Sequence, residues 1–188
     1  MNRVHNLICS SRWWAGRVED ELLPWGMKGV ELGDDALEVG PGFGATTRLL
    51  AQRPGRLTAL ELEPDSCERL RRKLGGRVEV VQGDATQMPF EDARFSGAAC
   101  FTMLHHVPAP ELQNRLFAEV FRVLRPGAVF AGTDSIGTGP IFKLIHIGDT
   151  LVPVDPDGLP ARLEAAGFAE PRVKIGGRSF KFAARKPG

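Results

Sequence analysis

The stretch Ala36-Leu-Glu-Val-Gly-Pro-Gly-Phe-Gly-Ala-Thr-Thr47 decides the fold of this chain. Its first four residues are typical of a buried strand, and they run directly into a turn with three glycines and then into a helical pattern. Glycine has no β-carbon, so Gly40, Gly42 and Gly44 permit a tight turn and the close approach of a ligand to the backbone. The stretch predicts a strand, turn and helix that hold a nucleotide-like ligand.

The glycines alone leave two kinds of ligand open. The spacing Gly40-x-Gly42-x-x-Ala45 matches one form of the dinucleotide fingerprint, which indicates a nicotinamide cofactor. Glu38, two residues before the first glycine, favours another ligand. A pyrophosphate is anionic, whereas a carboxylate beside the turn attracts a ligand with cationic groups. S-adenosylmethionine has two such groups, an ammonium and a sulfonium.

Length, charge and cysteine content limit the class of protein. A chain of 188 residues is expected to form one domain. Its 24 basic and 23 acidic residues give a net charge of +1, so no nucleic-acid partner is expected from the overall charge. Cys9, Cys67 and Cys100 are widely spaced, which favours reduced thiols and a cytoplasmic location. We expect neither a secretory signal nor a membrane span, because apolar runs are too short.

Strand-like runs alternate with helical patterns from Ala36 onward, which predicts a mostly parallel sheet with helices on both faces. The expected strands are at about 36–39, 57–61, 78–82, 97–102 and 128–134, and the helices at about 45–53, 65–74 and 111–124. After a looser segment, a helix at 158–166 and two strands at 172–175 and 179–184 close the chain.

Three acids stand at or just after the predicted strand ends. Glu38, Glu61 and Asp84 are separated by 23 residues each time, which is one strand-helix unit. Ligands of open α/β sheets bind outside the carboxyl ends of the strands, so we expect these acids at one edge. The Glu61 carboxylate can accept hydrogen bonds from both hydroxyls of a ribose. The Asp84 carboxylate can accept a hydrogen bond from the exocyclic amine of adenine, and the backbone N–H that follows can donate to a ring nitrogen. Single acids at strand ends are often merely solvated, but three beside a glycine turn favour a binding site.

At this point the chain resembles the class I S-adenosylmethionine-dependent methyltransferases. The resemblance covers about residues 36–134, with the terminal helix and strand pair also as in that family. It rests on five motifs that stand in the family's order: Leu37-Glu-Val-Gly-Pro-Gly-Phe-Gly44, Ala59-Leu-Glu-Leu-Glu-Pro64, Gln82-Gly-Asp-Ala-Thr-Gln-Met-Pro-Phe90, Met103-Leu-His-His-Val107 and Glu119-Val-Phe-Arg-Val-Leu-Arg-Pro-Gly127.

The resemblance implies a Rossmann-like three-layer α/β sandwich. Its sheet would have seven strands in the order 3-2-1-4-5-7-6, with only strand 7 antiparallel. From the residues themselves, one methyltransferase domain is expected, with 1–35 as an N-terminal helical lid, 36–134 as the cofactor-binding core, and 135–188 as the acceptor-side segment and closing strands. The implied reaction moves a methyl group from S-adenosylmethionine to an acceptor and leaves S-adenosylhomocysteine. We expect a small or medium-sized, partly apolar acceptor, because the chain has little beyond the core fold with which to bind a macromolecule. A non-catalytic S-adenosylmethionine-binding protein, a nicotinamide-dependent oxidoreductase and a homodimer stay open.

The family's cofactor-binding positions carry over residue by residue. Glu38 and Gly40 would lie beside the methionine moiety, Glu61 would bind the ribose, and Leu62 and Met88 would flank the adenine ring. The implied set is Glu38, Gly40, Pro41, Gly42, Gly44, Glu61, Leu62, Asp84, Ala85, Met88 and Thr102. The chain differs from the family pattern at one position and lacks one subclass motif. Phe95-Ser96 stands where the family more often has Phe-Asp, and no Asn-Pro-Pro-Tyr motif of exocyclic-amine nucleic-acid methylases follows the fourth strand.

Histidines are the candidate catalytic residues. His105 and His106 come just after the fourth predicted strand, close to where the methyl group should lie. A general base is needed only if the acceptor arrives protonated, and histidine suits that role near neutral pH. The pair can instead simply shape the cofactor pocket. His5 is a weaker candidate base, and a metal site from His5, Cys9, His105 and His106 is not expected, because their spacing is irregular.

Two segments have two interpretations each. The N-terminal segment carries Trp13 and Trp14 and is either a helix that roofs the acceptor pocket or an amphipathic helix that packs on the sheet. The segment 135–156 is either a substrate lid, with Lys143 or His146 reaching inward, or an ordinary connection that packs on a neighbour.

Overall fold

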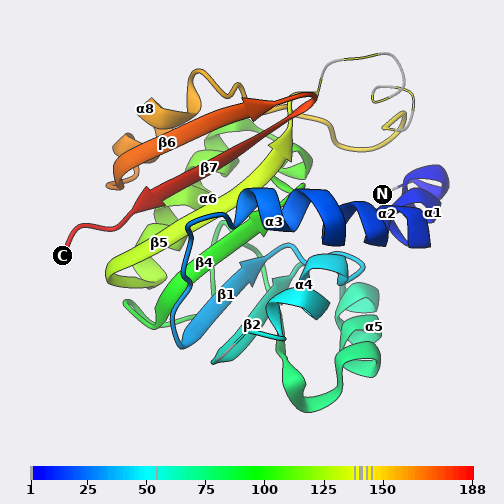
Figure 1. The fold of residues 1–188 in the computed structure, drawn as a ribbon, viewed down its shortest axis with the longest axis horizontal. Helices are drawn as coiled ribbons and strands as arrows, with labels where there is room; N and C mark the ends of the chain where they lie inside the picture. Colours follow the sequence, from blue (N-terminus) through cyan, green and yellow to red (C-terminus); the bar gives the residue numbers. More distant parts are fainter. Residues whose placement is uncertain (1, 54, 138, 140–141, 143, 145) are drawn as a thin grey trace.

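A single mixed sheet organises the molecule. The computed structural model describes residues 2–53, 55–137, 139, 142, 144 and 146–188, and of residues 3–5 only the backbone. Seven strands follow the order β3-β2-β1-β4-β5-β7-β6 (Figure 1). β7 is antiparallel to β5 and β6, and the four remaining pairings are parallel. The fold class and strand order predicted from the sequence are confirmed.

The centre of the sheet is apolar on both faces. β1 (Asp35–Val39) is buried at every position, with β2 (Arg56–Glu61) on one side and β4 (Phe95–Phe101) on the other. β3 (Glu79–Gln82) lies beyond β2. Parallel strands covered on both faces have nearly continuous apolar sequences, which explains why these runs were recognisable. The carboxyl ends of β1, β2 and β3 meet at one edge, as expected.

The fifth strand begins earlier than the sequence indicates. β5 (Leu124–Ser135) follows α6 (Pro110–Val123) without a break, whereas the strand was expected from about residue 128. Leu124 already pairs with Phe95 of β4, and the register shifts before Gly97 pairs with Val129. The Pro-Gly pair therefore makes an irregularity inside the strand instead of a separate turn. β6 (Ala169–Gly176) and β7 (Ser179–Arg185) complete the sheet.

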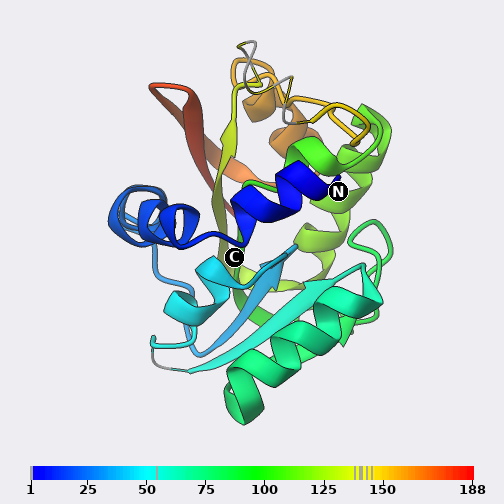
Figure 2. The same ribbon diagram turned by 90° about the vertical axis from the view of Figure 1, so that its right-hand side faces the viewer.

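Helices cover both faces of the sheet and enclose two apolar cores (Figures 1 and 2). α6 and α8 (Leu159–Ala165) contribute Phe117 and Leu163 to one core, beside Phe130 of β5. α4 (Ala45–Leu50) and α5 (Pro64–Leu74) contribute Leu50 and Leu70 to the other. Both α5 and α6 begin with proline, whose fixed φ and missing N–H suit the first helical position.

The N-terminal segment forms three short helices instead of one. They are α1 (Arg3–Cys9), α2 (Arg12–Arg17) and α3 (Leu23–Gly26), and a π-helical stretch, Val18–Leu22, separates the last two. Ser11 marks the first break, because its hydroxyl accepts the Trp14 N–H (3.1 Å) and donates to the Ile8 carbonyl (2.7 Å). Capping of this kind satisfies backbone groups at a helix end.

None of the helices in the described part of the chain is long and apolar enough to cross a membrane.

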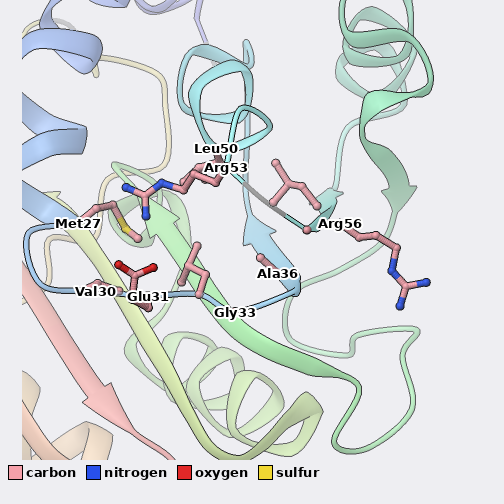
Figure 3. A pocket seen from close by; sticks show the side chains of 11 residues that line it. Met27, Val30, Glu31, Gly33, Ala36, Leu50, Arg53 and Arg56 are labelled. Carbon is pink, nitrogen blue, oxygen red and sulfur yellow. The ribbon is translucent and has the colours of Figure 1, made fainter.

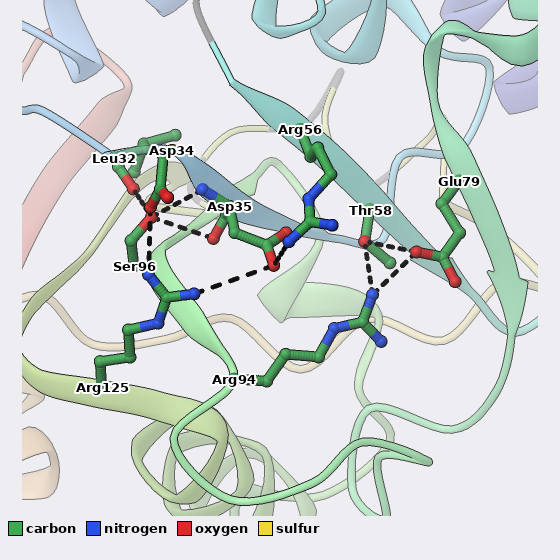
Figure 4. A network of polar contacts seen from close by, with 9 residues as sticks. All are labelled: Leu32, Asp34, Asp35, Arg56, Thr58, Glu79, Arg94, Ser96 and Arg125. Atoms are coloured by element: carbon green, nitrogen blue, oxygen red, sulfur yellow. Dashed lines mark hydrogen bonds and ion pairs between the residues drawn. The ribbon is translucent and has the colours of Figure 1, made fainter.

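Ser96 ties the amino ends of the central strands together (Figure 4). Its hydroxyl accepts the N–H of Asp35 at 2.9 Å and donates to the Leu32 carbonyl at 2.8 Å. Arg125 forms an ion pair with Asp34 at 3.0 Å in the same network. The serine that departs from the family pattern therefore links the start of β4 to the start of β1 and to the residues before it.

Candidate active site

The glycine turn between β1 and α4 is packed on two sides and open on a third. Gly40, Gly42 and Gly44 have φ angles of 69°, 54° and 79°, in the left-handed region that glycine adopts without strain. A β-carbon on Gly40 would collide with Met103, and one on Gly44 would lie 2.7 Å from a methyl group of Leu70. A β-carbon on Gly42 would meet no described atom within 4 Å. Gly42 therefore borders open space on the side of the turn that faces away from Met103 and Leu70.

Glu61 connects the end of β2 to this turn. Its carboxylate accepts the Gly42 N–H at 3.0 Å and the Glu63 N–H at 3.1 Å, and the residue is 8% exposed. The Glu61 carbonyl also accepts the Gly83 N–H at 3.0 Å, which ties the end of β2 to the loop after β3. These bonds hold the carboxylate beside the open side of the turn. Its role as ribose ligand stays a prediction.

Glu38 is buried at the end of β1, with 1% of its surface exposed. One carboxylate oxygen accepts a hydrogen bond from Thr46, and the other, Oε2, has no partner among the described residues. Burial raises the pKa of Glu38 to about 7; the hydrogen bond from Thr46 opposes this shift, and the charge of Glu61 adds to it. A buried carboxylate with an open acceptor position is a site that a cationic group of a ligand would stabilise.

Asp84 lies at the same edge, in the loop after β3. It is exposed, and its carboxylate accepts the Thr86 N–H at 2.7 Å. Ala85 is half-buried and packs against the core that contains Phe117. The structure thus brings Glu38, Glu61 and Asp84 to the edge at which their spacing predicts them. Their contacts with a cofactor remain predictions.

The two residues expected to flank adenine differ in accessibility. Leu62 is 58% exposed, at the tip of β2. Met88 is 4% exposed and belongs to the apolar core, where its N–H donates to Glu119 at 2.7 Å. Thr102, just past β4, has a φ of 50°, and its N–H donates to the Thr133 carbonyl at 2.7 Å. Of the predicted pair, Leu62 has the open surface that a stacking ring requires.

His105 is held by an acid at the end of β5. Its Nδ1 and its backbone N–H both bond to the carboxylate of Asp134, the latter at 3.1 Å. His105 and Asp134 are almost fully buried. An acid that accepts from Nδ1 orients the ring and leaves Nε2 as the basic nitrogen. Asp134 is missing from the residues predicted from the sequence, although it too is an acid at the carboxyl end of a strand.

The N-terminal helices and the segment after β5 meet above this edge, which faces the viewer in Figure 2. The side-chain amide of Asn2 donates to the Ile147 carbonyl at 2.8 Å, and His146 is buried beside His105. The side chain of His5 and all of Lys143 lie outside the described residues.

Burial raises the pKa of the Cys9 thiol to about 11, and Asp149 adds to the shift, so this thiol is neutral near pH 7.

Two pockets lie away from the three carboxylates. One, of about 400 Å³, opens at the amino ends of β1 and β2 and is lined by Met27, Leu50 and Arg56, among others (Figure 3). The other, of about 380 Å³, lies between α2 and the start of α4 and includes Phe43 and Gly44. Ligands of open parallel sheets bind at the carboxyl ends of the strands. The first pocket is therefore at the wrong edge for a cofactor.

The fold and the acids at one sheet edge define a Rossmann-like domain of the methyltransferase kind. A family model described as a methyltransferase domain matches residues 37–132, more than half of the chain. The chain therefore belongs to the class I S-adenosylmethionine-dependent methyltransferase family. This confirms the class of protein predicted from the sequence.

Similar proteins include enzymes named for lipid acceptors. A 24-methylenesterol C-methyltransferase 2 of Oryza sativa subsp. japonica is 37% identical over 112 residues, which cover 56% of this chain and 30% of that protein. A fatty-acid O-methyltransferase of Mycolicibacterium smegmatis is 38% identical over 107 residues, which cover 55% of this chain and 38% of that protein. The chain thus spans about a third of the length of these relatives.

Solved structures show the same fold. A crystal structure of a protein from Pyrococcus horikoshii OT3 superimposes with a TM-score of 0.80 and covers 95% of this chain and 93% of that one, at 20% sequence identity. At this identity the likeness concerns the fold alone.

Proposed function

We propose that this domain binds S-adenosylmethionine and transfers its methyl group to a small or medium-sized, partly apolar acceptor. The observation that carries the proposal is the environment of Glu38. A buried carboxylate, one oxygen of which has no hydrogen-bond partner in the described part of the chain, lies next to a left-handed glycine turn, and Glu61 stands at the turn's open side. A cationic ammonium of the cofactor would stabilise Glu38, whereas a pyrophosphate would be repelled by both acids.

The reaction needs little covalent chemistry from the protein. The sulfonium is already a good leaving group, so the domain has to position and desolvate the two reactants. The acceptor's lone pair forms a bond to the methyl carbon, the carbon–sulfur bond breaks, and its electron pair stays on sulfur. His105, which Asp134 orients, is the candidate to take up a proton from an acceptor that arrives protonated. His106 and His5 are weaker candidates for this role.

Exposed apolar side chains near the same edge support a partly apolar acceptor. Leu7 and Trp13 are exposed on the N-terminal helices, and Leu144 and Ile147 on the segment after β5, with exposed fractions between 65% and 72%. We call these four residues the apolar rim. Exposed apolar residues that gather into one patch mark a contact site, which is the role we propose for the rim. Two similar proteins are named as sterol and fatty-acid methyltransferases, which is consistent with such an acceptor.

The decisive experiment is a transfer assay with S-adenosylmethionine that carries a labelled methyl group. The protein is incubated with fractions of a cell extract, and label is sought in the apolar fractions by mass spectrometry. We expect label in at least one small, partly apolar compound. Tight binding of the cofactor without transfer to any fraction would favour a non-catalytic binding protein. Label in macromolecules alone would contradict the proposed acceptor class.

A further inference from the structure

Three of the chain's four histidines lie together beside the carboxyl ends of β4 and β5. The ring centroids of His105 and His106 are 4.2 Å apart, and His146 lies 5.3 Å and 5.5 Å from them. His105 and His146 are buried, at 3% and 5% exposure, and His106 is half-buried. One ring nitrogen of each histidine lies within 4.8 Å of a ring nitrogen of both others. We call these residues the histidine cluster.

Hydrogen bonds indicate which nitrogen of each neutral imidazole ring carries the proton. Nδ1 of His105 bonds to the Asp134 carboxylate, Nδ1 of His146 to the Phe142 carbonyl at 2.7 Å, and Nδ1 of His106 to the Thr150 carbonyl at 3.3 Å. Carboxylate and carbonyl oxygens only accept hydrogen bonds, so Nδ1 carries the proton in each neutral ring. Nε2 then has the lone pair. Metal-binding histidines show this pattern, with the second nitrogen bonded to a carboxylate or a backbone carbonyl.

The spacing of the cluster suits a small divalent cation. Zinc–nitrogen bonds of about 2.0–2.1 Å place the ligand nitrogens of a tetrahedral site about 3.4 Å apart. The candidate ligand nitrogens lie within 4.8 Å of one another, so they would have to approach by at most about 1.4 Å to reach this spacing. Asp134, which is fully buried, adds a negative charge next to His105. The cluster thus combines neutral nitrogen ligands with a nearby charge that offsets that of the cation.

We propose that His105, His106 and His146 bind a divalent transition metal of the zinc type through Nε2, with Asp134 positioning His105. Three protein ligands leave one tetrahedral position open, as in catalytic zinc sites. No such site is expected from the sequence, because His146 is 40 residues beyond His106, in a segment without a regular pattern. In the sequence, the other metal-binding residue types near the pair in the expected fold are His5 and Cys9, whose spacing is irregular.

The role of the metal rests on the proposed methyltransferase function. A hydroxyl or thiol acceptor that binds at the open position loses its proton to solvent more readily, because the cation stabilises the anion. The anion's lone pair then forms the bond to the methyl carbon, and the electrons of the broken carbon–sulfur bond remain on S-adenosylhomocysteine. The metal thereby replaces a free His105 as the means of removing the acceptor's proton. The acceptor class is accordingly a partly apolar alcohol or thiol.

Cobalt is a direct probe, because four-coordinate Co²⁺ absorbs visible light and the octahedral aqueous ion absorbs only weakly. The chelator-treated full chain is titrated with Co²⁺, and Zn²⁺ is then added to displace it. We expect stoichiometric binding with the spectrum of a four-coordinate ion. His146→Ala is expected to lose that spectrum. Leu144→Ala, an exposed change in the same segment, is the matched control and is expected to retain it.

Two further variants complete the test. Asp134→Asn is expected to weaken Co²⁺ binding about 10- to 100-fold, the usual effect of removing a group that orients a metal-binding histidine. Should near-ultraviolet circular dichroism show that His146→Ala is misfolded, His106→Gln replaces it, since His106 is half-buried. A wild-type chain without the four-coordinate spectrum, or a folded histidine variant that keeps it, would overturn the metal site.

The cofactor site serves as an independent reference. Glu61→Gln is expected to weaken S-adenosylhomocysteine binding and to leave the Co²⁺ titration unchanged, whereas folded His146→Ala should show the reverse. Failure of the wild-type chain to bind S-adenosylhomocysteine would contradict the proposed function and leave the metal site standing. Normal cofactor binding together with an absent Co²⁺ spectrum would overturn the metal site alone.

Discussion

At the scale of single residues, Glu38 makes ligand binding at the candidate site depend on pH. Its ordinary pKa is 4.5, and burial raises it to about 7 in the folded protein. Near neutral pH the carboxyl group is therefore partly protonated. A cationic ligand favours the ionised form, so binding below pH 7 has to drive the loss of a proton.

We expect the affinity for S-adenosylhomocysteine, which keeps the ammonium group, to rise between about pH 6 and about pH 8 and then to level off. Above the pKa of Glu38 the carboxylate is already ionised, and no proton has to leave. Titration calorimetry at several pH values measures this dependence. Glu38→Gln should bind more weakly and without the rise. If the affinity of the wild-type protein is constant across this range, the Glu38 carboxylate does not interact with the ammonium group of the cofactor.

The same residue affects the stability of the ligand-free protein. Because the pKa of Glu38 is higher in the folded state than in the unfolded chain, its contribution is fully favourable below about pH 4.5 and is lost as pH rises through about 7. Glu38→Gln should therefore raise the free energy of unfolding at pH 8 by on the order of 1–3 kcal/mol. The gain should shrink toward pH 4.5. Denaturant unfolding at both pH values gives the comparison, and an equal change at both would contradict it.

The two other acids at this edge, Glu61 and Asp84, allow a separate prediction about cofactor binding. Glu61→Ala and Asp84→Ala should each weaken S-adenosylhomocysteine binding at least about tenfold, since a hydrogen bond to a charged group contributes roughly 1.5–3 kcal/mol. Glu63→Ala is the control, because Glu63 is an exposed acid two residues after Glu61 whose side chain caps no helix. Unchanged affinity in both test variants would exclude this edge as the cofactor site.

At the scale of elements, the N-terminal helices and the segment after β5 form one border of the candidate site. Asn2 reaches Ile147, and the apolar rim is divided between these two parts of the chain. Neither part carries the cofactor residues predicted from the glycine turn and the acids. Changes in the rim should therefore affect the acceptor and spare the cofactor.

Trp13→Ala tests this separation on α2. Once an acceptor is identified, we expect the variant to raise its KM several-fold, because an exposed tryptophan offers a large apolar contact. The Kd of S-adenosylhomocysteine should not change. Arg12→Ala, an exposed change on the same helix, is the matched control for steady-state kinetics. An equal loss of cofactor affinity in Trp13→Ala would place the tryptophan in the cofactor site instead.

At the scale of the whole molecule, ligand binding and folding are coupled. The turn, Glu61 and the loop after β3 are joined by hydrogen bonds that exist only when β1, β2 and β3 are aligned. A ligand that binds this assembled edge stabilises the folded state and not the unfolded chain. The increase in the free energy of unfolding with each ligand therefore shows which cofactor binds to the assembled site.

S-adenosylhomocysteine at 100 times its Kd should raise the free energy of unfolding by about 2.7 kcal/mol. NADH at the same concentration should have no comparable effect, because its pyrophosphate meets two carboxylates. Denaturant or thermal unfolding with each ligand measures the difference. Greater stabilisation by NADH would reverse the choice between the two cofactors and support the oxidoreductase alternative.

Most of the fold follows from local patterns, and the deviations have local causes. The strands around β1 are buried on both faces and have apolar sequences that stand out. The break at Ser11 and the early start of β5 were not predicted. The first depends on a side-chain cap that a helical pattern does not reveal, and the second on pairing between Leu124 and Phe95, which are distant in sequence.

The sequence by itself determined the strand, turn and helix around Gly40 and the common edge of Glu38, Glu61 and Asp84, because these depend on backbone freedom and on regular spacing along the chain. Only the tertiary structure decided which histidines meet. His146, which is 40 residues beyond His106 in the sequence, lies beside His105, and Asp134 bonds to His105 from the next strand of the sheet. Such contacts depend on how distant elements pack, and no periodic pattern encodes them.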